Sequence, residues 1–307
     1  MADMDALTAE EVAKILRVSR NTVYNLVKRD ELASYFVGRK MRFSMDDVEN
    51  YIARSSVKQE LHPEPLTLDE HSNHSSFAIA GNDIVGDMMA NYLGATLHMS
   101  FERIYKGSYA ALVDVFAGRA QAALVHLRDP SGEYNVSFVK RMLPGMRVRL
   151  VRIVKRRQGL IVAKGNPKNL RSWADLGRGG IRIANRERGC GSRVLLDEML
   201  ERHGIDREVL VGYGREYPTA LRAAALVARG AADVCVGSER TYHQVEGVDF
   251  LPLQDEWLDA ALSLETRQCI EVAEATCRLL RTRAFSEDVG QLVGYNTSCM
   301  GQIIFEQ

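Results

Sequence analysis

The sequence contains no apolar run that approaches the ~20 residues of a membrane-spanning helix, and its acidic start, M-A-D-M-D-A, is unlike a signal peptide. Cysteine is scarce: there are five, an odd number without a C-x-x-C pair, which argues against a disulfide framework or a zinc site. Lysine plus arginine and aspartate plus glutamate both number 40, so net charge alone indicates no partner. These absences predict a cytoplasmic protein with reduced thiols, and we expect no metal, no cofactor and no membrane partner.

The residues that are present have the proportions of an ordinary globular protein, with 46% apolar and 26% charged. A length of 307 residues allows two or three domains, each with its own core. The charges are unevenly spread, because residues 17–42 hold seven basic and two acidic side chains, a local excess of five. An excess of this size matches the phosphate footprint of a small DNA-binding module.

The N-terminal stretch also has the pattern of a helix-turn-helix. Apolar residues recur at helical spacing in two short runs, which are Val12, Ile15 and Leu16, then Val23, Leu26 and Val27. Between these runs, Val18 and Ser19 predict a tight corner, and the serine can cap the second helix. Two short helices that meet at such a corner form a helix-turn-helix, whose second helix enters the major groove of DNA.

A wing and a third helix are predicted after the two helices. Residues 35–43 indicate two short strands around Gly38, and Ser44 can cap the helix that follows. The corner, the wing and the basic excess coincide, so we favour DNA contact over a merely solvated helix face. The predicted DNA-contacting residues are Ser19, Arg20, Asn21, Thr22, Tyr24, Asn25, Lys28, Arg39, Lys40 and Arg42.

The composition divides the chain into a winged helix-turn-helix domain at 1–54, a polar linker with two prolines at 55–76, and a body at 77–307. In the body, short strands and helices alternate, which favours a parallel sheet with helices on both faces. Strands are predicted at 77–81, 96–101, 121–126, 148–154, 181–185 and 233–237. Helices are predicted at 84–93, 110–117 and 267–280, and from near 192 and 218.

Four strand-to-helix junctions predict a shared ligand cleft, because ligands of open α/β sheets bind beyond strand ends and at helix N-termini. The candidate contacts at these junctions and at one strand end are Asn82, Asp83, Ser108, His126, Cys190, Gly191, Ser192, Arg193, Tyr217 and Thr219. Each has a simpler structural alternative. The side chains at the junctions can act as helix caps, Arg193 can form a structural ion pair, and His126 can be a buried, hydrogen-bonded histidine.

Several motifs resemble a known family. H-L-R-D-P-S-G-E-Y-N, R-R-Q-G-L-I-V-A-K-G-N-P, N-R-E-R-G-C-G-S-R-V-L-L-D and G-Y-N-T-S-C-M-G are similar to the periplasmic-binding-protein-like sensor domain of bacterial one-component regulators. The N-terminal part resembles the excisionase- and MerR-like winged helix-turn-helix. The resemblance implies an α/β, two-lobed type II fold that binds a small ligand between its lobes. Lobe I would comprise about 77–156 and 265–307, and lobe II about 157–264.

The resemblance also bears on individual residues. Tyr134 and Asn135 lie in a family-like loop and are expected to close over the cleft. A second loop that usually reads G-S-G-T-R here has a thiol at Cys190, followed by Gly191, Ser192 and Arg193. Relatives of this sensor domain are compared with molybdate- and tungstate-binding proteins, and the thiol puts an oxygen-rich oxyanion pocket in question.

Together these features predict a transcriptional regulator that binds a double-stranded DNA operator and senses a small, anionic effector. The effector would be an oxyanion such as molybdate or tungstate, or a small metabolite. A homodimer or higher homo-oligomer is expected, because one short head contacts few bases and paired half-sites strengthen binding.

Two alternatives belong to other classes of protein. One is an enzyme on the same fold with Cys190 as nucleophile, since a helix N-terminus and nearby arginines lower the pKa of a thiol. No partner base can be assigned from the sequence, so we expect that the protein is not an enzyme. The other is an excisionase-type architectural DNA-binding factor with a passive body.

Overall fold

The structure, a computed structural model, describes residues 7–16, 18–28, 32–38, 40–45, 47–48, 51 and 76–307. The chain forms two compact units, Met1–Leu66 and Thr67–Gln307. The predicted linker at 55–76 lies outside the described residues except for Ser76, which begins the first strand of the larger unit. Among the described residues, no helix is long and apolar enough to cross a membrane.

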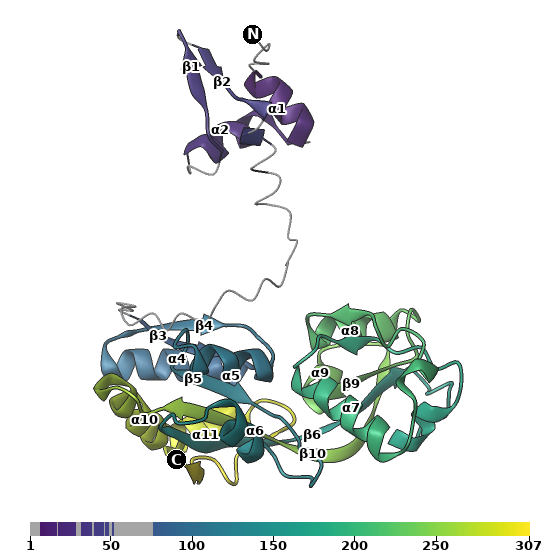
Figure 1. Ribbon diagram of the computed structural model, residues 1–307. Helices are drawn as coiled ribbons and strands as arrows, with labels where there is room; N and C mark the ends of the chain where they lie inside the picture. The colour runs from purple at the N-terminus through teal and green to yellow at the C-terminus, as the bar shows by residue number, and fades with distance from the viewer. Residues whose placement is uncertain are drawn as a thin grey trace. The chain divides into compact units, whose positions relative to one another are not determined.

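The smaller unit is a helix-turn-helix with a wing, as the sequence predicts (Figure 1). Its elements are α1 (Ala9–Leu16), α2 (Arg20–Lys28), β1 (Tyr35–Val37) and β2 (Lys40–Arg42). The N–H of Thr22 donates to Ser19 Oγ at 3.1 Å, so Ser19 caps α2, and the two strands pair antiparallel. The core holds Val12, Val23, Leu26, Leu32, Phe43 and Val48.

The predicted apolar stripe of the first helix is only partly correct. Val12 is fully buried, but Ile15 is 40% exposed and Leu16 is half-buried. Helix α1 has only eight residues and packs chiefly on α2, so only one narrow face of α1 contacts the core.

The larger unit has two lobes, one drawn in blue and yellow and the other in green in Figure 1. Lobe I contains the parallel strands β3 (Ser76–Ala80), β4 (Ser100–Ile104) and β5 (Ala122–Val125). Its helices are α4 (Ile84–Leu97), α5 (Ser108–Phe116), α6 (Val136–Met142), α10 (Arg267–Leu280) and α11 (Arg283–Gly290). Two buried clusters, one led by Phe77 and Ile79 and one by Ala78 and Ala80, lie on opposite faces of β3, so helices cover both faces of this sheet.

Lobe II is built around β9 (Val234–Ser238), which pairs antiparallel with a long strand that comes from lobe I. The remaining elements of lobe II are η1 (Trp173–Gly177), β7 (Asn185–Arg186), α7 (Gly191–Arg202), η2 (Arg207–Val209), β8 (Glu216–Tyr217), α8 (Ala220–Ala228) and α9 (Glu239–His243). Two apolar clusters again flank the sheet, one around Trp173 and one around Val227.

Two long strands, β6 (Val148–Ala163) and β10 (Val248–Ser263), connect the lobes and pair antiparallel along their length. In lobe I, β10 also pairs with β5, and in lobe II, β6 pairs with β9. The short strands β11 (Tyr295–Asn296) and β12 (Ile303–Glu306) add to β6. The predicted parallel sheet is therefore only partly correct, because β3, β4 and β5 are parallel but this antiparallel ribbon runs through both lobes.

The predicted elements of the body agree with the structure except at a few boundaries and at 181–185, where only isolated bridges at Arg182 and Ile183 and the two-residue strand β7 form. The helix predicted at 267–280 matches α10, but the strand predicted at 96–101 begins only at Ser100. Helix α4 continues to Leu97 and ends where His98 adopts a left-handed conformation at φ 52°. The strand predicted at 148–154 continues to Ala163, because its polar middle at 155–158 connects the lobes and its apolar end enters the core of lobe II.

Candidate ligand cleft and DNA-contacting surface

A cleft of about 430 Å³ lies between the two lobes. Its lining comprises Asn82, Asp83, Ile84, Asp87, Tyr105, His126, Arg156, Gln158, Arg186, Ser192, Thr219, Ala220, Leu221, Ser238, Arg240, Thr241, Gln244 and Tyr295. Residues in the first turns of α4, α7, α8 and α9 line it. The partial positive charge of a helix N-terminus favours an anion at such a position.

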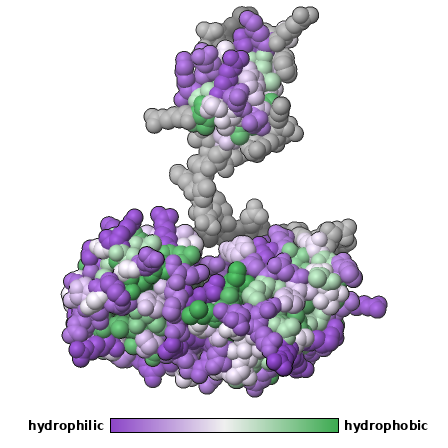
Figure 2. All heavy atoms as spheres, turned by 180° about the vertical axis from the view of Figure 1, so that it is seen from behind, coloured by the Kyte–Doolittle hydropathy of each residue, from purple (hydrophilic) through white to green (hydrophobic). Residues whose placement is uncertain are grey.

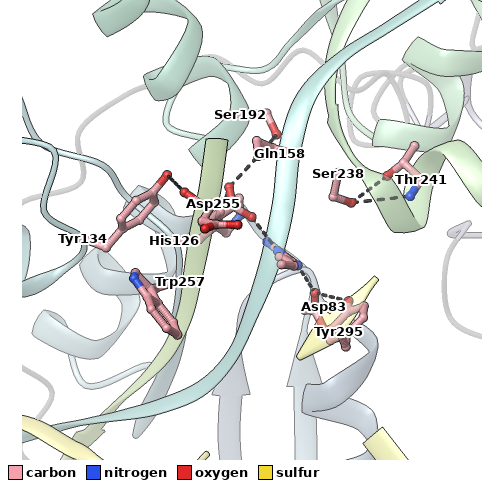
Figure 3. A network of polar contacts seen from close by, with 12 residues as sticks. Asp83, His126, Tyr134, Gln158, Ser192, Ser238, Thr241, Asp255, Trp257 and Tyr295 are labelled. Carbon is pink, nitrogen blue, oxygen red and sulfur yellow. Dashed lines mark hydrogen bonds and ion pairs between the residues drawn. The ribbon is translucent and has the colours of Figure 1, made fainter. Parts of the chain in front are cut away.

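The floor of the cleft is a buried ion-pair network on the strands that connect the lobes (Figure 3). Arg156 pairs with both Asp83 and Glu256, and these three side chains are 8%, 6% and 1% exposed. Tyr295 donates its hydroxyl hydrogen to Asp83 Oδ2 at 2.8 Å, and His126 Nδ1 lies 3.0 Å from Glu256 Oε2. The network therefore joins lobe I to both connecting strands.

The charge state of Glu256 follows from its neighbours. Burial raises the pKa of the Glu256 carboxyl, but the charge of Arg156 and the hydrogen bonds from His126 and Arg156 outweigh burial and lower this pKa to about 2. Burial also opposes the charge of Arg156, yet Glu256 and Asp83 hold its pKa well above the ordinary value. Both members of the central pair are ionised across the physiological range.

Gln158 is held against this network with one polar atom unpaired. Its Nε2 donates to Ser192 Oγ at 3.0 Å and to Glu256 Oε2 at 3.1 Å. Because an ionised carboxylate only accepts hydrogen bonds, the NH2 group of Gln158 must face Glu256. The buried Oε1 is then left without a hydrogen-bond partner among the described residues.

Arg240 differs from the other arginines that line the cleft in its ion pairing. Arg156 and Arg186 are ion-paired, with Arg186 Nη2 at 2.7 Å from Glu187 Oε1. Arg240 is half-buried, and its Cζ lies 5.6 Å from the centre of the Tyr295 ring. Within the described ranges it forms no ion pair, so it presents an uncompensated positive charge to the cleft.

The mouth of the cleft is apolar. Ile84 and Tyr105 of lobe I and Leu221 of lobe II are 40%, 62% and 45% exposed, and all three line the cleft. Figure 2 shows a hollow between the lobes with apolar surface beside it. The cleft thus has a charged, hydrogen-bonding floor and a partly hydrophobic rim.

Five of the twelve predicted ligand residues line the cleft, namely Asn82, Asp83, His126, Ser192 and Thr219. Two of them are also helix caps, which unites the two roles that the sequence left open. Asp83 Oδ1 accepts from the N–H of Val85 at 2.9 Å, and Thr219 Oγ1 accepts from the N–H of Arg222 at 3.1 Å.

The structure places the other seven outside this lining: Ser108, Tyr134, Asn135, Cys190, Gly191, Arg193 and Tyr217. Tyr134 and Asn135, predicted to close over the cleft, instead hold strand β10. Asn135 Nδ2 donates to Asp259 Oδ2 at 2.7 Å, and the Tyr134 hydroxyl donates to the carbonyl of Asp255 at 3.2 Å.

The glycine-rich loop before α7 also has a structural role. Arg193 Nε donates to Asp197 Oδ1 at 3.0 Å, the structural ion pair that the sequence left open. Cys190 is 3% exposed, and burial raises the pKa of its thiol more than Arg186 lowers it. This raised pKa is the opposite of what a cysteine nucleophile needs.

The remaining three residues support the cleft from outside its lining. Gly191 packs so closely on His126 that a Cβ atom would lie 2.3 Å from the ring. Ser108 Oγ accepts from the N–H of His126 at 3.3 Å, and the carbonyl of Tyr217 accepts from Arg186 Nε at 3.1 Å.

Sequence reasoning missed the connecting strands as the source of the floor. Of the residues missed, Arg156, Gln158 and Glu256 lie on these strands, and Arg186, Arg240 and Tyr295 lie on β7, α9 and β11. A usable signal was present, because Gln158 directly precedes G-L-I-V-A and Glu256 directly precedes W-L-D-A-A-L. A polar side chain at the edge of an apolar strand is a candidate for a buried, paired group.

The DNA-contacting surface predicted on α2 is exposed. Ser19, Arg20, Asn21 and Asn25 are exposed, and a groove of about 460 Å³ is lined by Asn21, Tyr24, Asn25, Val27 and Met41. Asn21 and Asn25 are four residues apart, so they share one face of the helix.

The other predicted DNA contacts differ in how free their side chains are. Arg20 Nη2 donates to the hydroxyl of Tyr24 at 3.1 Å, and the Ser19 and Thr22 hydroxyls, 2.8 Å apart, are engaged in the cap. On the wing, Lys40 is exposed, and Arg42 Nη1 donates to the carbonyl of Met41 at 3.0 Å. The side chain of Lys28 and the whole of Arg39 lie outside the described residues.

Comparison with known proteins identifies two domains. Residues 91–272 match the model of a family described as a PBP superfamily domain, and residues 6–56 match a helix-turn-helix domain. The chain is 36% identical over 311 residues to the uncharacterized protein YvgK of Bacillus subtilis (strain 168), with 100% of both chains covered. It is 34% identical over 113 residues to an uncharacterized protein in the ferredoxin 2Fe-2S gene 5′ region of Clostridium pasteurianum, covering 37% of this chain and 99% of that protein.

Solved structures share the fold of the larger unit at low sequence identity. The structure of EhuB in complex with hydroxyectoine has a TM-score of 0.55 and 14% identity, covering 76% of this chain and 96% of that chain. The effector-binding domain of a BenM variant has a TM-score of 0.50 and 13% identity, covering 72% and 99%. These likenesses establish the two-lobed fold.

Proposed function

Because this chain belongs to the PBP superfamily and carries a helix-turn-helix domain in front, we propose that it is a ligand-responsive regulator of transcription. The effector is a small anionic molecule that binds between the lobes. The observation that carries this proposal is Arg240, a cation without an ion-pair partner among the described residues, in a cleft onto which α4, α7 and α8 open.

The connecting strands β6 and β10 supply the means of response. A ligand that contacts both lobes favours one arrangement of the lobes over another, and it shifts the protein only by this difference in affinity. The lobes are joined by a paired ribbon with a bulge between Pro252 and Gln254, where its register shifts. In a homodimer, a ligand-induced change in the arrangement of the lobes would change the spacing of the two recognition helices. Their fit to half-sites one helical turn apart would then change as well.

The test is DNA binding by the full-length chain with and without effector. A pool of random double-stranded DNA is first enriched for binding, and the selected sequence is then titrated by fluorescence anisotropy. We expect the binding midpoint to shift about tenfold at saturating effector, which corresponds to the coupling free energies common in allostery. Superimposable curves would remove the regulatory part of the proposal, and they would favour an architectural DNA-binding factor.

We also propose that the cleft does not catalyse a reaction. Cys190 lies outside the cleft lining, is buried, and has a thiol pKa raised by burial. Replacement Cys190→Ser should therefore leave effector binding unchanged. If the wild-type protein turns over a bound compound and Cys190→Ser abolishes this turnover, the alternative of an enzyme with Cys190 as nucleophile is supported instead.

A further inference from the structure

On the basis of the proposed function, we infer that the effector is a small organic acid with an N–H or O–H donor and an apolar substituent. An inorganic oxyanion such as molybdate or tungstate does not fit the same site. Three observations in the cleft each specify one part of this molecule, and each rests on different residues.

The acidic group is specified by Arg240. Its guanidinium has no carboxylate partner among the described residues, whereas Arg156 is bound on both sides by Asp83 and Glu256. A guanidinium presents a planar set of donors that matches the two oxygens of a carboxylate. The carboxylate of the effector is therefore assigned to Arg240 rather than to the floor.

The donor is specified by Gln158. Its amide orientation is fixed by Glu256, so the unpaired atom is the carbonyl oxygen Oε1, an acceptor. Gln158 is 1% exposed and lines the cleft. A buried acceptor without a donor carries a desolvation cost, and a ligand N–H or O–H that pairs with it recovers this cost as affinity.

The apolar substituent is specified by the rim. Ile84 and Tyr105 on lobe I and Leu221 on lobe II are exposed large apolar side chains that line the same cleft from opposite lobes. An apolar group between them would bury surface on both lobes at once, which favours a closed arrangement.

Molybdate and tungstate lack two of these three features. At neutral pH both are fully deprotonated tetrahedral dianions, which accept hydrogen bonds but donate none, so they leave Gln158 Oε1 unpaired. They also have no apolar part for the rim.

The experiment is a calorimetric titration of the full-length chain with four probes: 2-hydroxy-4-methylpentanoate, leucine, 4-methylpentanoate and molybdate. The third probe has the same carbon skeleton and carboxylate as the first two but lacks the donor. We expect the hydroxy acid or the amino acid to bind about tenfold tighter than 4-methylpentanoate, the effect of one hydrogen bond to a buried group. The tighter of the two tells whether the donor is a hydroxyl or an ammonium group.

Variants test the apolar part and identify the site. Leu221→Ser should weaken binding of the tightest organic acid several-fold and leave the melting temperature unchanged, because Leu221 is 45% exposed. Val211→Ser is the matched control, since Val211 is an equally apolar lobe II residue, 54% exposed and outside the cleft lining. Equal affinities for Leu221→Ser and Val211→Ser would contradict the role of the rim.

The possible outcomes separate this inference from the proposed function. If 4-methylpentanoate or molybdate binds as tightly as the donor-bearing acids, or if neither of those acids binds, the inference is wrong. Molybdate that binds and shifts the DNA titration would overturn the inference and leave the proposed function standing. A donor-bearing acid that binds without changing DNA affinity would support the inference and contradict the proposed function.

Discussion

The polar side chains of helix α2 and those on the floor of the cleft differ in how many partners they have. Asn21 and Asn25 are exposed on the helix, and the structure gives neither a side-chain hydrogen bond among its described residues. Arg156, Glu256 and Asp83 are buried and bound to one another. The helix is therefore positioned by the apolar core beneath it and leaves the side chains of Asn21 and Asn25 available for contacts, whereas the floor uses its polar groups to hold the lobes together.

The largest effect is expected from removing one charge of the floor. Glu256→Gln leaves Arg156 with one carboxylate fewer in a buried site and should lower the free energy of unfolding by about 3 kcal/mol at pH 7. Both tryptophans, Trp173 and Trp257, lie in the larger unit, so urea unfolding followed by tryptophan fluorescence reports on that unit alone. The control is Glu274→Gln, which breaks a surface pair with Arg149 and should cost less than about 1 kcal/mol.

The same pair of proteins gives a pH dependence with a definite sign. The pKa of Glu256 is lowered from 4.5 to about 2 in the folded protein, so its stabilising contribution is present above about pH 4.5. This contribution is lost as the pH falls from 4.5 toward 2. The difference between the wild-type protein and Glu256→Gln should therefore shrink over that interval, and a constant difference would show that the carboxylate is not held ionised by its neighbours.

The next largest effect is expected on the helix. Asn21→Ala or Asn25→Ala should weaken binding to selected DNA by about 1–3 kcal/mol, because asparagine can bind the edge of an adenine with two hydrogen bonds. A contact to a base edge neutralises no phosphate group, so the dependence of affinity on salt concentration should stay the same. Anisotropy titrations at several salt concentrations measure both quantities. Unchanged DNA affinity in both variants would show that the exposed face of α2 is solvated and does not contact DNA.

A smaller effect is expected for the unpaired cation of the cleft. Arg240→Gln should weaken effector binding about tenfold with little change in melting temperature, because no buried ion pair is broken. Arg229→Gln is the matched control, an exposed arginine of lobe II outside the cleft lining. If the two variants bind the effector equally well, Arg240 does not hold the acidic group.

The smallest effect is expected for a helix cap. Thr219→Ala and Thr266→Ala each remove a hydroxyl that accepts a backbone N–H at 3.1 Å, and each should cost about 1 kcal/mol of stability. Only Thr219 lines the cleft, so only its variant should also weaken effector binding in calorimetry. Equal ligand affinity in both variants would reduce Thr219 to a structural cap.

The features predicted correctly from the sequence depend on neighbours close along the chain. The cap at Ser19 accepts from Thr22, three positions away, and α10 follows a regular apolar spacing. The floor of the cleft depends on distant partners instead. Arg156 and Glu256 are 100 positions apart, and Asp83 and Tyr295 are 212 apart, so no local pattern relates them. For the same reason, the contacts of Asn135 with strand β10 could not be foreseen.

The most direct test of the account is thermodynamic coupling between the two units, measured by calorimetric titration of the tightest-binding probe into the full-length chain. The titration is made with and without saturating selected DNA. Coupling between binding sites is reciprocal, so DNA must change the dissociation constant of the probe by the same factor by which the probe changes DNA affinity. We expect a change of about tenfold. Identical dissociation constants in the two titrations would contradict control of DNA binding by the effector.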